Sequence, residues 1–374
     1  MLWKAIAILL ALLVTRHFVN LALLLGYHKT SLMNHWPGPC RTVPPVENGA
    51  EDIALTKSGL AIITSGIDIN YRADATDPRI SEAEGKLFAF DFNHPEKNAV
   101  ELKFTGDFEF VPHGIGIWES ADDGTFLFVV NHRRDAETIE IFKLSGTAAK
   151  PILEHVESVQ DPLFTSMNDV VATGPRSFYV SNDGYLRYTV MRAVERLFNR
   201  PWGSVVHYNG KTARKVVDSA FEYNGMSLSR DGKFLFISCP FALSIAIYER
   251  STDSNDLSFQ QDIHVGTFPD NIFVHPGTGD LWIGCSPIGH RVFAAFGNLD
   301  NWAPSQAIRV RPLGTDAKPF EKFKLYEVYY DDAHLMSSSS SAVVVGNKLL
   351  VGSIVHKLVF CDMKTETNLP RDQY

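Results

Sequence analysis

The sequence predicts an all-β protein, a six-bladed β-propeller. The first observation is a repeated segment in which a turn residue precedes a short apolar strand. It occurs six times, at intervals of 47 to 68 residues, and its first apolar residues are Leu60, Phe126, Phe178, Phe234, Leu281 and Leu349. The second observation is that another strand precedes each segment and a third follows it. Three or four strands repeated six times, with turns between them, are typical of a propeller.

The flanking strands are recognised by their apolar and aromatic residues. Those expected before the repeated segment read DIALT, GIGIW, DVVAT, GMSLS, NIFVH and SAVVV. Those expected after it read KLFAFDF, TIEIFKL, SVVHYNG, SIAIYER, RVFAAFGN and HKLVFCDM. A pair of β-sandwiches is the alternative, but it would not explain six repeated units.

Helical spacing is scarce in the body of the chain, with an exception at residues 185–203, which read YLRYTVMRAVERLFNRPWG. Met191, Val194, Leu197 and Phe198 would share one face of this helix. We expect a short lid-like helix here. Whether it covers the propeller or is a packed insertion is not decided by the sequence.

The first residues, MLWKAIAILLALLVTRHFVNLALLLGY, differ from the rest because they are almost entirely apolar. We expect residues 1–30 to form a hydrophobic signal or anchor helix and residues 31–374 to form the propeller. No small-x-small cleavage site follows the apolar run, which favours a retained signal anchor over a cleaved signal peptide. In either case the chain would enter the secretory pathway, as a membrane-anchored or secreted protein that meets a membrane or lipid surface.

The composition is that of an ordinary globular protein, with 45% hydrophobic and 21% charged residues among 374. The formal net charge of -8 argues against a general nucleic-acid partner, since such proteins neutralise phosphates with clustered Lys and Arg. The four cysteines show no CxxC spacing, so nothing supports a zinc or redox site. In an oxidising compartment a disulfide becomes plausible.

Polar residues stand at the start of the expected innermost strands, which run beside the central channel. In five of the six repeats they supply a carboxylate, an amide or an imidazole, and they are Glu51, Asp52, His113, Asn168, Asp169, Asn224, Asp270 and Asn271. The sixth repeat offers only the serine run Ser337 to Ser341. Each pair alone would more often be a turn former. The convergence across repeats favours a shared site.

Burying so many polar groups is costly unless something satisfies them, and a hard divalent cation would do so. Calcium takes six to eight oxygen ligands from carboxylates, amides and carbonyl groups. We expect Glu51, Asn168, Asn224, Asp270 and Asn271 to hold one ion. Asp52 and Asp169, which strand alternation turns away from the first set, would hold a second ion deeper in the channel. Zinc or iron is disfavoured because no thiolate joins the oxygens.

The sequence resembles the paraoxonases, a family of calcium-dependent arylesterases and lactonases. The resemblance runs from about Cys40 to Cys361 through the motifs GAEDIAL, VPHGIGI, FVVNH, NDVVATGPRSFYVSND, NGMSLSRDGKFLFIS, DNIFVHPGTGDLWIGC and LLVGSIVHKLVFC. It implies a six-bladed propeller with two calcium ions in its channel. It gives the catalytic ion the five ligands named above, and the structural ion Asp52, Asp169 and the carbonyl of Ile115. It also implies a disulfide between Cys40 and Cys361.

The resemblance assigns His113 and His132 to a pair that handles the attacking water. A neutral imidazole would remove a proton from this water while calcium polarises the ester carbonyl. The alternative for His132 is a buried, hydrogen-bonded core histidine. We therefore expect a calcium-dependent hydrolase of lactones and aryl esters.

The chain departs from the family in the wall of the pocket. The segment Asn182 to Leu186 lacks a histidine that the family usually has, Ser286 follows Cys285 where the family has histidine, and Glu222 replaces an aromatic residue. Hydrolysis is expected and the substrate is left open. Two alternatives remain, a propeller binding or adhesion module with structural calcium and strictosidine-synthase-like chemistry, which the full oxygen cage disfavours.

Overall fold

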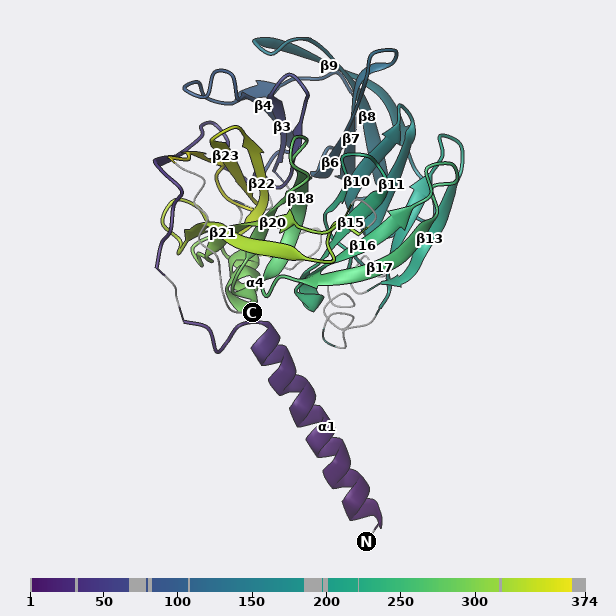
Figure 1. Ribbon diagram of the computed structural model, residues 1–374, viewed down its shortest axis with the longest axis vertical. Coiled ribbons are helices and arrows are strands. Elements are labelled where there is room, and N and C mark those ends of the chain that lie inside the picture. The colour runs from purple at the N-terminus through teal and green to yellow at the C-terminus, as the bar shows by residue number, and fades with distance from the viewer. Residues whose placement is uncertain are drawn as a thin grey trace.

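The computed structural model describes residues 2–30, 33–66, 79, 83–106, 108–184, 197, 201–220, 222–315 and 318–364. Within them, six antiparallel sheets of four strands each surround a central axis (Figure 1). This arrangement confirms the predicted six-bladed propeller. The helix predicted at residues 185–203 falls almost wholly outside the described residues.

Each of the first five blades is built from four consecutive strands, ordered from the axis outwards as they follow in the chain. Blade 1 contains β2 (Ile53–Leu55), β3 (Leu60–Ser65), β4 (Lys86–Asp91) and β5 (Val100–Leu102). Blade 2 contains β6 (Pro112–Ser120), β7 (Gly124–His132), β8 (Glu137–Thr147) and β9 (Lys150–Val159). Blade 3 contains β10 (Met167–Gly174), β11 (Ser177–Asn182), β12 (Gly203–Tyr208) and β13 (Ala213–Ala220).

The remaining blades follow the same plan. Blade 4 contains β14 (Met226–Leu228), β15 (Phe234–Cys239), β16 (Ser244–Arg250) and β17 (Leu257–His264), with the short 3-10 helix η2 (Pro240–Ala242) between β15 and β16. Blade 5 contains β18 (Phe268–Val274), β19 (Leu281–Ser286), β20 (Ser305–Pro312) and β21 (Phe323–Asp331). Blade 6 contains β22 (Ser339–Val345), β23 (Lys348–Ser353), β24 (Val359–Asp362) and, as its outermost strand, β1 (Cys40–Thr42).

The ring is closed by pairing the two ends of the propeller chain. Strand β1 adds to β24 in antiparallel register, with Cys40 opposite Cys361. These two cysteines form the disulfide that the family resemblance implied, across a sequence separation of 321 residues. The other two cysteines, Cys239 and Cys285, are buried and lie outside the disulfide. The covalent bond therefore fixes the N-terminal strand of the propeller chain within the last blade.

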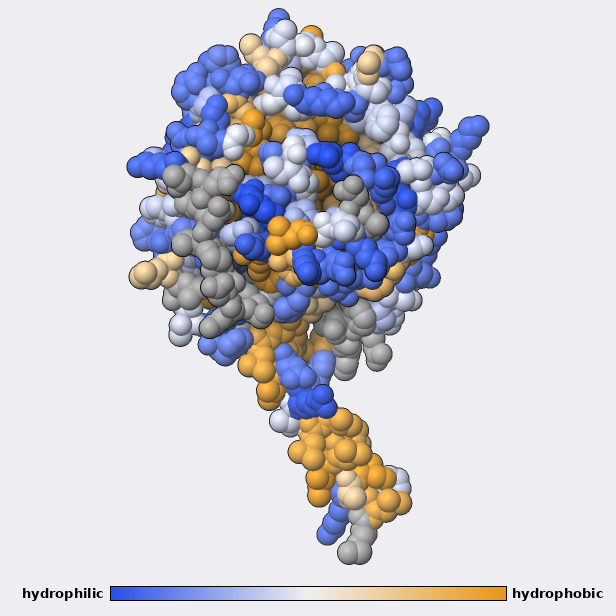
Figure 2. Space-filling model, viewed as in Figure 1, coloured by the Kyte–Doolittle hydropathy of each residue, from blue (hydrophilic) through white to orange (hydrophobic). Residues whose placement is uncertain are grey.

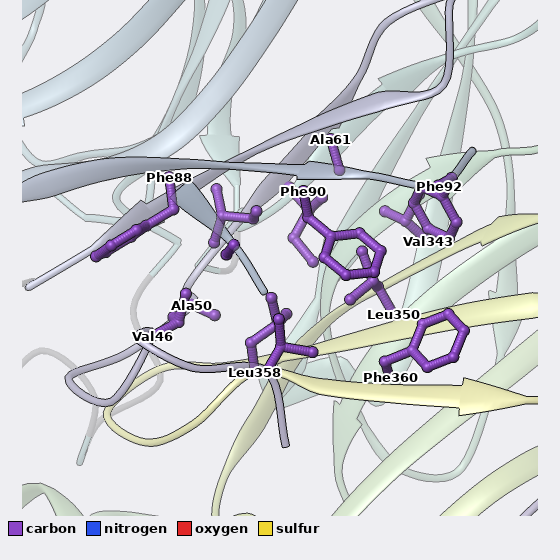
Figure 3. Close-up of a cluster of buried hydrophobic side chains, with 14 residues drawn as sticks. Val46, Ala50, Ala61, Phe88, Phe90, Phe92, Val343, Leu350, Leu358 and Phe360 are labelled. Atoms are coloured by element: carbon purple, nitrogen blue, oxygen red, sulfur yellow. The ribbon is translucent and has the colours of Figure 1, made fainter. Parts of the chain in front are cut away.

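The core of the protein lies between neighbouring blades. Six clusters of buried apolar residues fill the six interfaces, because each strand presents alternate side chains to the blades on its two sides. Figure 3 shows the interface between blades 1 and 6, where Phe90 and Phe92 lie near Leu350 and Phe360. The Phe90 side chain is 1% exposed, and burying a ring of this size contributes about 2 kcal/mol.

One predicted strand is wrong. The segment RVFAAFGN is not the third strand of blade 5 but most of helix α4 (Gly289–Gly297), and β20 takes the expected place in the sheet. Val292 and Ala295 are buried, and Phe296 packs beside them. Their spacing of three and four residues is that of one helix face. A short apolar run fits both a strand and a helix, which is why the sequence misled here.

The N-terminal helix α1 (Leu2–Leu24) projects away from the propeller (Figure 1) and buries none of its residues. Figure 2 shows its surface as largely hydrophobic. At about 1.5 Å per residue, its 23 residues reach about 35 Å, which is enough to cross a hydrocarbon layer. Its length and composition also fit a signal sequence. The predicted N-terminal hydrophobic helix is confirmed.

Candidate metal centre and hydrolytic site

Polar side chains from five blades lie where the innermost strands begin. Glu51 and Asp52 directly precede β2, and Asn224 lies two residues before β14. The others occupy the first four positions of β6, β10 and β18, and they are His113, Asn168, Asp169, Asp270 and Asn271. Hydrogen bonds join residues that are far apart in sequence, since Nδ2 of Asn271 donates to Oε1 of Glu51 at 2.9 Å. The ring of blades thus brings the predicted residues together across the axis.

The backbone pairing is irregular at three of these positions. The register between the first and second strands shifts between Pro112 and Ile115, between Met167 and Val170, and between Pro269 and Ile272. An irregular register bends the strand and re-aims its side chains. The shifts occur at the polar residues themselves. The regular alternation of side chains between the two faces of a strand therefore does not hold at these positions.

Among the described residues, no hydrogen-bond donor reaches a buried oxygen atom on four of the five residues expected to hold the catalytic ion. These atoms are Glu51 Oε2, Asn168 Oδ1, Asp270 Oδ1 and Asn271 Oδ1. A buried acceptor without a partner costs about 1–3 kcal/mol, and proteins rarely keep several together. The fifth, Asn224, accepts the Gly225 N–H at 2.6 Å through its own Oδ1. Unpaired oxygens of carboxylates and amides are the ligands that calcium takes.

Asp52 and Asp169 lie beside this set and connect neighbouring blades. Asp52 accepts the N–H of Ile53 at 2.7 Å and the N–H of Ile115, in the next blade, at 2.9 Å. Asp169 repeats the arrangement with Val170 at 2.6 Å and Met226 at 2.5 Å. Each carboxylate therefore clamps its own strand to the following one. The third ligand predicted for the structural ion is the carbonyl of Ile115. The N–H of this same residue donates to Asp52.

The carboxylates perturb one another electrostatically. Burial, followed by the charge of Glu51, raises the pKa of Asp52 to about 7. Burial and the charges of Asp52 and Glu51 also raise the pKa of Asp169 well above its usual value. The pKa of Asp270 is likewise raised well above its usual value, by burial and then by Glu51 and Asp52. Keeping each of these buried carboxylates ionised costs free energy, and a bound cation would lower that cost.

Two glycines allow the inner strands to approach this closely. A Cβ atom added to Gly114 would lie 2.5 Å from Cα of Asp169, and one added to Gly225 would lie 2.5 Å from Cα of Asn271. Real side chains do not reach such distances without moving the backbone. The PHGIG and NGM motifs therefore contain glycine because the next blade touches the chain at this point.

The serine run of the sixth blade supports the site without adding a charge. Ser340 donates its hydroxyl to the carbonyl oxygen of Glu51 at 2.6 Å. Asn271 Nδ2 donates to the same oxygen at 3.0 Å. The backbone of Glu51 is thus held from blades 5 and 6. Within the described part of the chain, Ser341 Oγ is buried and has no hydrogen-bond partner.

The two predicted histidines are in direct contact. His113 Nδ1 lies 2.8 Å from His132 Nε2, and both side chains are buried. On the other side, His113 Nε2 lies 3.5 Å from Glu51 Oε1. His132 is therefore buried and hydrogen-bonded, as the core-histidine alternative expected. It also contacts His113, whose other ring nitrogen lies near Glu51.

Sequence reasoning missed a carboxylate that continues this line. Glu137 Oε2 lies 2.7 Å from His132 Nδ1, and its side chain is buried. The signal was present in the sequence as a histidine at the end of one strand and a glutamate at the start of the next, five residues later. It could be interpreted only by assuming that these strands form a tight hairpin.

A cavity of about 90 Å³ adjoins the oxygen set between blades 4 and 5. Its wall includes Asn224 and Asp270, the departures Glu222 and Ser286, and the apolar residues Phe241, Phe268, Val292, Phe293 and Phe296. Glu222 has a positive φ of 45°, which is uncommon for a residue with a side chain. A larger cavity, of about 340 Å³, is lined by Asp52, Asp169 and apolar residues further along the inner strands. Neither His113 nor His132 lines either cavity. The smaller cavity is lined by Asn224 and Asp270, two of the residues expected to hold the catalytic ion, and it is therefore the candidate substrate cavity.

Within the described part of the chain, no three His, Cys, Asp or Glu residues form a cluster that could hold a metal ion. The oxygens gathered at the axis come from asparagine amides as well as from carboxylates. The donor set fits a hard, oxygen-binding cation and not zinc.

Fold and site together define a six-bladed propeller with a polar layer of carboxylates, amides and imidazoles on its axis. The profile of a known family, described as Arylesterase, matches residues 36–363. The chain belongs to the arylesterase family. The expected class, an enzyme that hydrolyses ester bonds, is the class of this family.

Curated relatives cover nearly the whole propeller. Serum paraoxonase/arylesterase 2 of Gallus gallus is 32% identical over 328 residues, which are 87% of this chain and 88% of that protein. Serum paraoxonase/arylesterase 1 of Homo sapiens is 31% identical with the same coverage. Serum paraoxonase/lactonase 3 of Oryctolagus cuniculus is 32% identical over 332 residues, 87% of this chain and 89% of that protein.

Solved structures agree in fold at low sequence identity. A luciferin-regenerating enzyme superposes with a TM-score of 0.53 at 12% identity, covering 86% of this chain and 94% of the other. A calcium-binding protein, regucalcin from Agrobacterium tumefaciens, gives a TM-score of 0.51 at 11% identity, covering 89% and 96%. These likenesses support the propeller fold.

Proposed function

We propose that this protein is a calcium-dependent hydrolase of carboxylic esters, acting on lactones and aryl esters. The observation that carries the proposal is the set of buried oxygen atoms without donors on Glu51, Asn168, Asp270 and Asn271. Such atoms are costly in a folded protein unless a ligand satisfies them. Asn224, whose amide hydrogen-bonds to Asp270, completes the proposed ligand set of the catalytic ion.

We further propose that the protein binds two calcium ions. Four carboxylates interact near the axis, Glu51, Asp52, Asp169 and Asp270, and together they would carry four negative charges. Among the described residues no lysine or arginine forms an ion pair with them, so two divalent cations would balance the charge. Asp52, Asp169 and the carbonyl of Ile115 are the proposed ligands of the second, structural ion.

The histidine pair is proposed to handle the proton of the attacking water. His113 Nε2 faces the oxygen set, where a water beside Glu51 would lie within its reach. His113 removes a proton from this water, and His132 behind it accepts a proton in turn. When bound, calcium would polarise the ester carbonyl and stabilise the negative charge that develops on it.

The cavity supports a small, largely apolar substrate. Phe241, Phe268 and Phe293 contribute to its wall, and an ester group would be the polar part nearest to Asn224 and Asp270. The names of the relatives, arylesterase and lactonase, point to the same class of molecule. Glu222 and Ser286 alter the wall relative to the family pattern, and they are the positions at which substrate preference would differ.

The N-terminal helix and the disulfide support a location in the secretory pathway. We propose that residues 1–30 form a segment that attaches the propeller of residues 31–374 to a membrane or lipid surface in the secretory pathway. The residues that follow α1 contact helix α4, which contributes to the wall of the cavity: the His290 N–H donates to the Leu25 carbonyl at 3.0 Å, and the Tyr27 and His290 rings stack at 4.2 Å. An apolar substrate dissolved in lipid would then meet the cavity beside the anchor.

The proposal is tested with the full chain in mild detergent. Aliphatic lactones of several ring sizes and phenyl acetate are offered with saturating calcium and after calcium removal. Hydrolysis is expected only with calcium, and Asn168→Ala should abolish it, whereas the exposed control Asn98→Ala should not. Full activity after calcium removal would contradict the proposal. Calcium binding without hydrolysis of any substrate would instead indicate the binding-module alternative.

A further inference from the structure

Four buried side chains form a continuous line from the oxygen set into blade 2. Glu51 Oε1 lies 3.5 Å from His113 Nε2, and His113 Nδ1 lies 2.8 Å from His132 Nε2. His132 Nδ1 then lies 2.7 Å from Glu137 Oε2. The exposed fractions of the four are 1%, 7%, 2% and 4%. The line is therefore shielded from water along its length.

The strand register fixes Glu137 in this position. His132 is the last residue of β7 and Glu137 is the first of β8, and the two are direct partners in the antiparallel ladder. The four residues between them make the hairpin. Directly opposed residues in such a pair have Cβ atoms about 5 Å apart, so a glutamate reaches an imidazole without leaving the sheet.

The hydrogen bonds in the line determine which nitrogen carries each proton. An ionised carboxylate only accepts, so His132 must donate from Nδ1 to Glu137. A neutral His132 then presents Nε2 as an acceptor, and His113 must donate to it from Nδ1. This leaves Nε2 of His113 as an acceptor on the side of Glu51. Only this tautomer of His113 can remove a proton from a water at the site.

We infer that Glu137 is a positioning residue of the hydrolytic site, the third member of a Glu–His–His relay. The inference rests on the proposed hydrolytic function and adds to it a residue outside the predicted set. Glu137 selects the tautomer of both histidines and stabilises the positive charge that the relay acquires. It touches neither substrate nor metal.

The proton movements of the relay balance. As the water oxygen bonds to the ester carbon, its proton passes to Nε2 of His113. The Nδ1 proton of His113 passes to Nε2 of His132, which becomes an imidazolium beside the Glu137 carboxylate. When the carbon–oxygen bond to the leaving group breaks, the leaving oxygen takes the proton back through His113. An aryl ester gives a carboxylic acid and a phenol, a lactone gives a single hydroxy acid, and the relay returns to its first state.

A second buried carboxylate of the same strand provides a matched control. Glu140 is 0% exposed and accepts hydrogen bonds from Asn131, Thr138 and Ser158, and it contacts His155 at 2.8 Å. Among the contacts of the described residues, none joins Glu140 to His113 or His132. Glu140→Gln therefore reproduces the loss of a buried charge in β8 without altering the relay.

The kinetic test compares Glu137→Gln with Glu140→Gln in the full chain with saturating calcium. The glutamine can still accept the His132 proton but carries no charge. We expect Glu137→Gln to lower kcat at least about tenfold and to leave KM within about twofold. Glu140→Gln should lower the thermal midpoint and leave kcat near that of the wild type. A wild-type kcat in Glu137→Gln, or an equal loss in both variants, would overturn the inference.

An NMR measurement tests the relay without turnover and without a variant of Glu137. In 15N-histidine-labelled wild-type protein, both His113 and His132 should be protonated on Nδ1, with the His132 proton shifted downfield by its bond to Glu137. His113→Gln and His132→Gln assign the two signals. A His132 protonated on Nε2 alone refutes the relay, even if Glu137→Gln fails to fold.

The two proposals fail in different ways. If the wild-type protein hydrolyses no ester or lactone while the histidines show these tautomers, the proposed function is wrong and the tautomer assignment stands. If the wild type is active and Glu137→Gln is equally active, the proposed function stands and the role of Glu137 is wrong.

Discussion

Removing calcium from this protein should make its stability depend on pH through Asp52. Burial and Glu51 raise the pKa of this carboxyl from 3.8 to about 7. Between these values the folded protein holds a proton that the unfolded chain has lost. A raised carboxyl pKa therefore stabilises the fold at low pH, and this stabilisation is lost as pH rises through 7. For a single group the loss between pH 5 and pH 8 is about 3 kcal/mol.

Other buried groups act in the opposite direction over part of this range. Burial lowers the pKa of His207 and of His356 to about 4. Folding holds these imidazoles neutral, so their contribution to stability increases with pH up to about 6.5. The absolute pH profile therefore mixes both effects. A comparison of wild type with Asp52→Asn cancels the histidines, because both proteins contain them.

The assay is urea denaturation of calcium-stripped protein between pH 5 and pH 8, followed by tryptophan fluorescence. We expect the free energy of unfolding of the wild type, relative to Asp52→Asn, to fall by about 3 kcal/mol across the range. With saturating calcium the fall should disappear, because the ion requires the ionised carboxylate. A difference between the two proteins that does not change with pH would refute the account of Asp52.

Three further predictions concern the framework of the site. Cys361→Ser opens a loop of 321 residues and should lower the free energy of unfolding by about 6 kcal/mol in the loop-closure estimate. Urea denaturation under non-reducing conditions measures this, and an unchanged midpoint would contradict it. Gly225→Ala places a methyl group 2.5 Å from the next blade. It should lower the free energy of unfolding by about 2 kcal/mol and weaken calcium binding. The control Gly297→Ala, whose methyl group meets nothing within 4 Å, should have neither effect. Deleting Leu2–Leu24 should abolish binding to lipid vesicles in a flotation assay while hydrolysis of water-soluble phenyl acetate continues, and undiminished flotation would exclude α1 as the anchor.

Much of the fold was predictable from the sequence because propeller strands carry local signals. Turn residues, β-branched runs and their repetition locate the six repeats, and the six second strands β3, β7, β11, β15, β19 and β23 contain the predicted apolar residues. The segment at α4 shows the limit of such signals. Arg291 to Asn298 is apolar enough for either element, and it became helical because Val292 and Ala295 bury one face.

The candidate site was predictable to the extent that it depends on position along a strand. Glu51, Asn168, Asn224 and Asp270 stand before or at the start of inner strands, and a ring of blades brings such positions together. Glu137 was not predicted, because its role depends on a hairpin register that pairs it with His132. The register shifts at Asn168 and Asp270 could not be predicted either. From the sequence, one expects side chains along a strand to alternate regularly between its two faces.

The sequence by itself determined which residue types occur at the start of each inner strand, and that an apolar helix precedes six repeats. These features depend on neighbours within about ten residues. Only the tertiary structure decided which oxygens keep a donor and which do not, because donors such as the Ile115 and Met226 N–H groups come from the next blade. Packing six blades around one axis sets those distances, and no local pattern encodes them.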